Sequence, residues 1–248
     1  MIRFLRILLY KVLGQKTYLQ LISSCYIKLI KMGWGEKKYQ ELHYLKEIIK
    51  PGFSCIDIGA NMGYYSVFLS KYTGPNGKVF SVEPVPLFCE IWKKNTAKTE
   101  HKNLTLFPYA LGEKESSVEM STPVINGIFH HGMTKVITDN KKEYDNPFSV
   151  EMKNPEQLFS NLDKIDFIKI DVEGYESVVL SNMCEIIKKH KPLIQSELSG
   201  DGNREKVIRI LTEIGYSVYN LTDRKLVESS PEMIKTIEKD FYFIASER

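Results

Sequence analysis

Cysteine is scarce in this 248-residue sequence, and the four cysteines form no pattern. Cys25, Cys55, Cys89 and Cys184 lie far apart, and no pair has the C-x-x-C spacing of a metal or redox site. The sequence therefore lacks a disulfide framework and a cysteine-based zinc site. We expect free thiols in a reducing, cytoplasmic compartment.

A long apolar run is also missing. About 18 uninterrupted apolar residues are needed to cross a bilayer, but Lys11 interrupts the run that opens the chain, and no small-x-small cleavage site follows it. We therefore predict neither a transmembrane helix nor a cleaved signal peptide. One helical face of the segment is apolar and carries Leu5, Leu8, Leu9 and Val12. This face favours a helix packed on the domain, with peripheral contact of residues 1–13 at the inner face of a membrane as the alternative.

The chain has little excess charge. Its net charge is +3, and its lysines are scattered among glutamates without a basic, aromatic stripe, which argues against a nucleic-acid partner. Apolar residues make up 43% of the chain and charged residues 26%, so a largely disordered protein is excluded. The oligomeric state is not determined by these features.

The order of apolar patterns predicts an α/β fold. Residues 1–50 have helical spacing and predict an N-terminal extension of two or three helices. In residues 51–248, short apolar runs alternate with helical stretches, which is typical of a mostly parallel sheet. Strands are expected at 54–58, 78–82, 104–111, 167–172, 193–198, 216–221 and 241–245, and helices at about 61–72, 86–96 and 204–214, with another after residue 172. Residues 117–153 show little periodicity and predict a long functional insertion, such as a lid.

A glycine-rich turn between a strand and a helix is the most informative segment. It reads Asp57-Ile-Gly-Ala-Asn-Met-Gly-Tyr-Tyr-Ser66, in the position of nucleotide-cofactor sites in α/β proteins. It departs from the dinucleotide pattern G-x-G-x-x-G because Asp57 replaces the first glycine, and no Gly-Lys-Ser/Thr of a phosphate loop follows. A carboxylate there would repel a pyrophosphate by about 1 kcal/mol in water, and by more where solvent is excluded. It would attract S-adenosylmethionine, which has no phosphate and carries an ammonium and a sulfonium.

An acidic residue ends the next predicted strand. Glu83 lies 26 residues after Asp57 and is followed by Pro84, which turns the chain away. A carboxylate in this position accepts hydrogen bonds from both ribose hydroxyls of a bound nucleoside. Together, the glycine turn and Glu83 predict a site for S-adenosylmethionine.

These motifs resemble the FkbM family of methyltransferases, most specifically in Ile168-Lys-Ile-Asp-Val-Glu-Gly-Tyr-Glu176. The resemblance implies a Rossmann-like class I methyltransferase with a seven-stranded, mostly parallel sheet whose last strand is antiparallel. It also implies O-methylation of a hydroxyl, often on a sugar of a glycan, glycolipid or natural product. The cofactor-binding residues that it implies are Asp57, Gly59, Ala60, Asn61, Gly63, Tyr64, Ser66, Glu83, Pro84, Tyr109, Ala110 and Asp171.

Two charged residues stand in a strand that should be buried on both faces. Lys169 and Asp171 alternate there with isoleucine and valine, which indicates a site, or else an ion pair between the two. Glu173 is our first candidate for the general base, because Gly174 after it would let the loop approach a substrate, and Asp171 is the second. Residues expected to contact the acceptor are His130, His131 and Glu197.

Alternatives remain at this stage. Asp171, Glu173 and Glu197 could together hold Mg²⁺ or Ca²⁺, but we predict no metal site. An N-methyltransferase would carry an Asn/Asp-Pro-Pro-Tyr loop where this chain has Asp171-Val-Glu-Gly174. A catalytically inactive module that binds S-adenosylmethionine is the third alternative, and the complete glycine turn argues against it.

Overall fold

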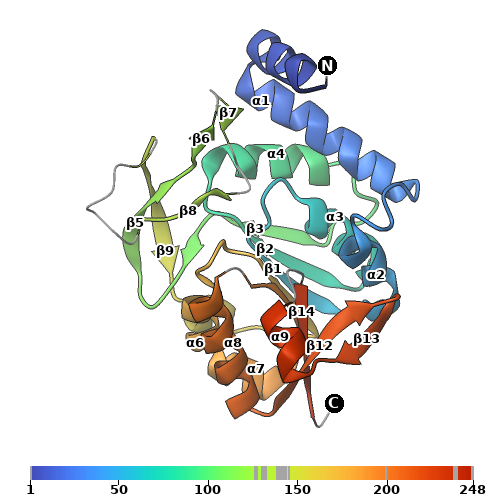
Figure 1. Ribbon diagram of the computed structural model, residues 1–248, viewed down its shortest axis with the longest axis vertical. Coiled ribbons are helices and arrows are strands. Elements are labelled where there is room, and N and C mark those ends of the chain that lie inside the picture. The colour runs from blue at the N-terminus through green and yellow to red at the C-terminus, as the bar shows by residue number, and fades with distance from the viewer. Residues whose placement is uncertain are drawn as a thin grey trace.

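An eight-stranded sheet runs through the centre of the molecule (Figure 1). The computed structural model describes residues 2–125, 128–129, 133–137, 144, 146–198, 200–236 and 240–246. The strands lie in the order β13-β12-β14-β11-β10-β1-β2-β3. Their bounds are β1 (Ser54–Ile58), β2 (Lys78–Val82), β3 (Leu104–Phe107), β10 (Phe167–Ile170), β11 (Leu193–Glu197), β12 (Tyr216–Thr222), β13 (Lys225–Glu228) and β14 (Asp240–Ala245).

Strand directions agree with the predicted class. Neighbouring strands from β3 to β11 pair in parallel, and β14 is antiparallel to both of its neighbours, β11 and β12. The α/β fold with an antiparallel last strand is therefore confirmed. The eighth strand, β13, was not predicted. It forms a hairpin with β12 through Asp223 and Arg224, both at positive φ, so this turn lacks the glycine that usually marks such a hairpin.

Both faces of the sheet are buried, because successive side chains of a strand point to opposite sides. Ile56, Ile168 and Ile194 belong to one core cluster, and their neighbours Cys55 and Phe167 belong to the other. The first cluster packs against the helices α6 (Glu176–Ser181), α7 (Cys184–His190) and α8 (Asp201–Glu213), and the second against α2 (Gln40–Ile48) and α3 (Tyr64–Thr73). The remaining helices of the domain are α4 (Pro86–Thr96), α5 (Pro155–Phe159) and α9 (Pro231–Thr236).

The N-terminal extension has three helical segments, as predicted. The helix α1 (Ile2–Lys31) is kinked at Gly14, whose φ of 71° is not helical, and α2 follows. The second half of α1 packs on α4, where Tyr18 and Leu19 are buried. Leu8 and Val12, expected on the packed face, are instead 47% and 72% exposed, so that part of the prediction is wrong. No helix in the described ranges meets the length and apolarity needed to cross a membrane.

The segment expected to have little regular structure forms a second sheet beside the first. Its order is β4 (Ala110–Leu111), β9 (Phe148–Lys153), β5 (Ser116–Ser121) and β8 (Lys135–Val136), next to the small ladder of β6 (Val124–Ile125) and β7 (Ile128–Phe129). The predicted strand 104–111 is therefore divided. β3 ends at Phe107, and Ala110 pairs with Met152 of β9. Pro108 has no N–H to donate to a continuing ladder, which explains the break.

Candidate active site

The glycine turn leaves β1 and enters α3 through residues 59–63. Gly59, Asn61 and Gly63 all have positive φ, so α3 begins at Tyr64 and not at Asn61 as predicted. A Cβ on Gly59 would lie 1.8 Å from the backbone oxygen of Asp171. Gly59 is therefore required for close approach of the turn to the end of β10, and not only for space around a ligand.

Asp57 is buried at the base of this turn, with 1% of its surface exposed. Burial raises the pKa of Asp57 to about 6, although the hydroxyl of Ser66 donates to its Oδ2 at 2.5 Å and favours the charged form. The indole N–H of Trp92 donates to the same Ser66 oxygen at 2.8 Å. Ser66 is fully buried behind the turn, so the structure places this predicted cofactor residue where it orients Asp57, and it lines neither of the two cavities described below.

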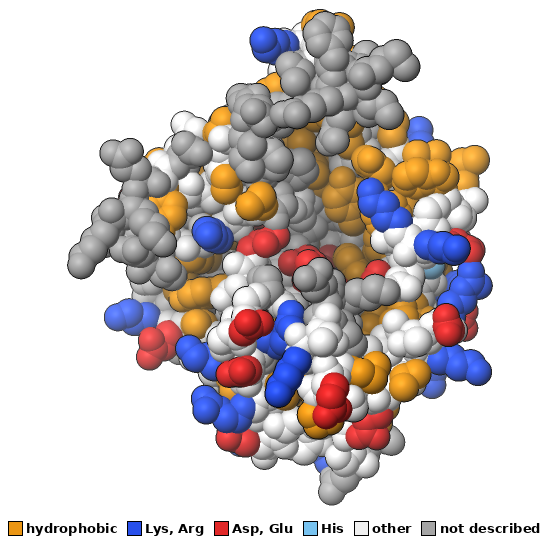
Figure 2. All heavy atoms as spheres, viewed as in Figure 1, with side chains coloured by type: hydrophobic (Ala, Val, Ile, Leu, Met, Phe, Trp, Pro, Cys, Tyr) orange, Lys and Arg blue, Asp and Glu red, His pale blue; other side chains and the backbone are white. Residues whose placement is uncertain are grey.

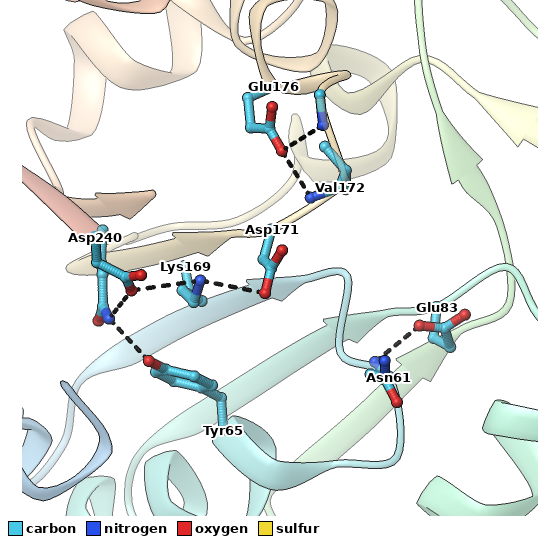
Figure 3. Close-up of polar contacts among 10 residues, drawn as sticks. Asn61, Tyr65, Glu83, Lys169, Asp171, Val172, Glu176 and Asp240 are labelled. Atoms are coloured by element: carbon cyan, nitrogen blue, oxygen red, sulfur yellow. Dashed lines mark hydrogen bonds and ion pairs between the residues drawn. The ribbon is translucent and has the colours of Figure 1, made fainter. Parts of the chain in front are cut away.

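Glu83 follows β2 and is 4% exposed. Its Oε2 accepts the backbone N–H of Asn61 at 2.7 Å, and its Oε1 accepts that of Val85 at 2.8 Å. Burial raises the pKa of Glu83 to about 7, although both hydrogen bonds favour the carboxylate. A carboxylate has about four acceptor positions, so two remain for ribose hydroxyls. The contact with Asn61 also ties the turn to the end of β2 (Figure 3).

A cavity of about 770 Å³, counted to its open mouth, lies over the ends of β1, β2 and β10, and we call it the cofactor cavity. Eight of the predicted site residues line it: Gly59, Asn61, Glu83, Pro84, Tyr109, Ala110, Asp171 and Glu173. Apolar side chains supply much of the remaining wall. Three further lining residues come from the second sheet: Met120 of β5, Val136 of β8, and Thr134 just before β8. No motif in the sequence predicted that these three residues would line the site.

This cavity fits the predicted cofactor. Its Glu83 offers free acceptor positions to a ribose, and Val85, Phe88 and Leu111 give it apolar walls suited to a flat purine. The carboxylates of Asp171 and Glu173 also line this cavity, where they favour a ligand that carries a positive charge. The described residues include no group of three or more His, Cys, Asp or Glu placed to hold a metal ion.

A second cavity, of about 960 Å³, lies on the other side of the glycine turn, and we call it the tyrosine cavity. Tyr26 from α1, Tyr39 before α2, and Tyr64 and Tyr65 from α3 line it, and so do Asp57, Ala60 and Lys169. Burial, followed by the proximity of Tyr39 and Tyr26, raises the pKa of Tyr64. Both cavities share Gly59, Asn61 and Asp171 as lining residues, so they meet at the end of β10.

Lys169 is 2% exposed in the middle of the sheet and lies between two carboxylates. Its Nζ is 3.6 Å from Asp171 Oδ2 and 3.6 Å from Asp240 Oδ2 (Figure 3). Burial by itself would lower the pKa of Lys169, but Asp240 and Asp171 outweigh it and raise that pKa. Gln195 donates to Asp240 at 2.5 Å and to the Tyr65 hydroxyl at 2.9 Å. The Lys169–Asp171 ion pair weighed from the sequence is therefore present, within a larger buried network.

The loop after β10 is held in a strained form by Glu176. Glu173 has a φ of 53° and Gly174 a φ of 92°. The fully buried Glu176 accepts the N–H groups of Val172 at 3.0 Å and Gly174 at 3.2 Å, and its other oxygen accepts from Asn203. Glu176 belongs to the quoted motif, but only the structure shows that it shapes the loop.

The carboxyl of Glu173 lines the cofactor cavity and is poised to exchange a proton near neutral pH. Glu173 is an exposed residue, but partial desolvation of its carboxyl, with Asp171 and Glu197 as nearby like charges, raises its pKa to about 7. Burial and Asp171 raise the pKa of Glu197 to about 7 as well, but Glu197 lines neither cavity. Gly63, another predicted cofactor residue, packs against Trp92. A Cβ atom added to Gly63 would lie 3.1 Å from the Cδ1 atom of Trp92. The remaining predicted contacts, His130 and His131, fall outside the described residues.

Comparison with known proteins agrees with this geometry. The Methyltransferase FkbM domain model matches residues 57–237, which is most of the chain. An FkbM methyltransferase from Methylobacillus flagellatus KT has the same fold, with a TM-score of 0.50 and 17% identity over 84% of this chain and 52% of that one.

Curated relatives share shorter stretches. The protein-L-isoaspartate O-methyltransferase of Caenorhabditis elegans is 26% identical over 144 residues, which are 56% of this chain and 64% of that protein. The enzyme of the same name from Aeropyrum pernix is 34% identical over 55 residues, covering 22% of this chain and 21% of that protein. The chain thus matches less than two thirds of the length of these relatives. On the family match, this chain belongs to the FkbM family of S-adenosylmethionine-dependent methyltransferases.

Proposed function

We propose that this methyltransferase acts on a hydroxyl group, and that the hydroxyl belongs to a saccharide of a glycan, glycolipid or natural product. The observation that carries the proposal is the meeting of two cavities at Asp171. One has the acceptor groups for a ribose, and the other is walled by tyrosines. Aromatic rings stack on the C–H faces of sugars, and phenol hydroxyls bond to sugar hydroxyls, so Tyr26, Tyr39 and Tyr64 suit a saccharide.

In this proposal Glu173 is the general base. S-adenosylmethionine supplies a methyl carbon bound to a positively charged sulfur. The acceptor oxygen forms a bond to that carbon as the carbon–sulfur bond breaks, which leaves S-adenosylhomocysteine. Glu173 takes the hydroxyl proton, a task for which a carboxyl group with a pKa of about 7 is suited at neutral pH. Asp171, paired with Lys169, orients the acceptor and the cofactor.

In this proposal, the protein also accelerates the reaction by aligning the acceptor oxygen with the methyl group. Methyl transfer is an in-line displacement, so the protein must hold the acceptor oxygen about 3 Å from the methyl carbon. Glu176 fixes the loop that carries Glu173, and the buried Lys169 network fixes Asp171. Both supports belong to regular elements of the fold, Glu176 to α6 and Lys169 to β10, which hold a site more accurately than loops do.

We also propose a cytoplasmic location with peripheral contact at the inner face of a membrane through residues 1–13. The free state of Cys25, Cys55, Cys89 and Cys184 supports a reducing compartment. The apolar and basic character of the first helical segment supports the membrane contact.

The test is transfer of radioactive methyl from S-adenosylmethionine to extracted saccharides, followed by mild base treatment. A sugar methyl ether survives the base, whereas a methyl ester on a carboxylate is released. We expect base-stable label that depends on Glu173. Label on an amine, or tight cofactor binding with no transfer to any saccharide fraction, would overturn the proposal.

A further inference from the structure

The exposed side of the N-terminal segment has an unusual composition. Residues 1–35 contain six Lys or Arg residues and no Asp or Glu, whereas the remaining residues contain more acidic than basic side chains. Six of the eight large apolar side chains that are exposed in the described residues also lie here: Leu8, Val12, Leu21, Leu29, Met32 and Trp34. An apolar surface without acidic residues is therefore concentrated on one helix and the turn that follows it.

The second half of α1 presents this surface as a continuous face. Leu21, Cys25, Lys28 and Met32 recur at spacings of three or four residues, so they lie in one row, and Leu29 lies beside it. All five are exposed, while Leu19, Ile27 and Ile30 on the opposite face are buried in the domain. In Figure 2, apolar side chains gather over the end of α1, beside a hollow that contains acidic side chains.

Positive charge borders the row. Among the ion pairs of the described residues, none involves Lys28 or Lys31. Lys71 of α3 is near enough to lower the pKa of Lys31, after the effect of burial, so like charges accumulate here. Trp34 is 47% exposed just beyond the helix, and tryptophan favours the boundary between lipid headgroups and acyl chains.

We propose that this face, made of Leu21, Lys28, Leu29, Lys31, Met32 and Trp34, docks the protein on an anionic lipid surface. The apolar side chains enter the headgroup boundary and the lysines bind lipid phosphates. Charge complementarity favours a lipid partner, because an acid-free basic segment matches a surface whose headgroups carry a uniform negative charge. The site extends the contact expected for residues 1–13 to the half of α1 that is anchored on the domain. Because the face lies beside the acidic hollow, docking also brings acceptors carried on lipid to the cavities, a consequence that rests on the proposed function.

One intrinsic reporter, Trp34, makes the docking measurable without any methyl acceptor. The chain has two tryptophans, and only Trp34 is exposed, since Trp92 is 5% exposed and bonded to Ser66. Vesicles of phosphatidylcholine with one-third phosphatidylglycerol should shift the emission of Trp34 to shorter wavelength and sediment with the protein. Vesicles of phosphatidylcholine alone should do so far less, and added salt should release the protein.

The variant Lys28→Gln, Leu29→Gln, Met32→Gln changes only exposed side chains and keeps good helix formers. We expect its partitioning to fall about 50-fold, about fivefold from the lost lysine and about tenfold from the lost apolar surface. The matched control Lys225→Gln, Val227→Thr removes an exposed lysine and an exposed apolar side chain from β13 and should bind as the wild type does. Circular dichroism verifies that each variant is folded.

Three results would overturn the proposal. The first is equal binding of the protein to neutral and anionic vesicles. The second is binding of the triple variant to anionic vesicles as tight as that of the wild type. The third is self-association of the wild type that the triple variant abolishes, when neither protein binds vesicles. The last result would assign the face to a second copy of the chain. None of them bears on methyl transfer, which is measured in solution with a soluble saccharide.

Discussion

Glu83 is the residue whose replacement tests the cofactor site most directly. In Glu83→Gln, one oxygen still accepts a backbone N–H, but the new amide nitrogen faces the second N–H as a donor. One acceptor position for the ribose is lost as well. A hydrogen bond to a charged group contributes about 1.5–3 kcal/mol, so we expect the Kd for S-adenosylmethionine to rise about 10- to 100-fold.

Isothermal titration calorimetry measures this directly, and thermal unfolding separates it from loss of the fold. The matched control is Glu90→Gln in α4, a carboxylate on the surface that pairs with Lys16. Its Kd should stay within about twofold of the wild type, since exposed ion pairs contribute little. The pH dependence of the Kd for S-adenosylmethionine provides an independent test of the role of Glu83. Protonation of Glu83 removes acceptor positions, so the wild-type Kd should rise as the pH falls through about 7, and Glu83→Gln should lack that rise.

The reasoning would be refuted by a Glu83→Gln protein that is folded and binds the cofactor as tightly as Glu90→Gln does. It would be refuted equally by a variant that keeps the full wild-type pH dependence. Either result would mean that the ribose hydroxyls bond elsewhere, and that Glu83 serves only to hold Asn61 and Val85.

Three further predictions concern the sheet edge. Gly59→Ala should destabilise the fold by more than the strain of about 1–2 kcal/mol that a side chain at positive φ causes, because its Cβ would overlap the Asp171 carbonyl. The control is Gly74→Ala, at a φ of 68° with no neighbour within 4 Å, which should show only that strain in thermal unfolding. Lys169→Met should cost about 3 kcal/mol by leaving Asp171 and Asp240 without a cation, and a denaturant midpoint equal to the wild type would contradict the network. Glu173→Gln should lower kcat about 100- to 10,000-fold with little change in the cofactor Kd. In the wild type, kcat/KM should rise as the pH passes up through about 7 and the base loses its proton; a flat profile would exclude Glu173 as the base.

Much of the fold could be read from local pattern. The strands 54–58 and 78–82 and the helix 86–96 have the predicted bounds, because each is delimited by apolar runs and by glycine or proline. The structure departs from the prediction in the segment 117–153, where the hydrophobic pattern is weak. β5 and β9 are strands of six residues that alternate polar and apolar side chains, a short pattern that the sequence analysis missed, and they pair with each other. Such long-range pairing has no signature in a local window.

The site divides in the same way. The glycine turn, Glu83 and the Lys169–Asp171 pair were expected from residue type and spacing, and the structure brings them to one edge of the sheet. Ser66 was expected to contact the cofactor, but its hydroxyl faces Asp57 behind the turn. Glu176 and the tyrosine cavity were not foreseen. Tyr26 and Tyr39 reach that cavity only because α1 and α2 fold back over the turn.

By itself, the order of residues determined the class of fold, the position of the cofactor turn and the preference for a cationic, phosphate-free nucleoside, because each depends on neighbours along the chain. Only the tertiary structure decided which carboxylates are buried together, how Glu176 strains the loop of Glu173, and which side of α1 is left uncovered. Those properties depend on the contacts that remove water from a group, and some of these contacts join segments more than 100 residues apart, as between β1 and β10.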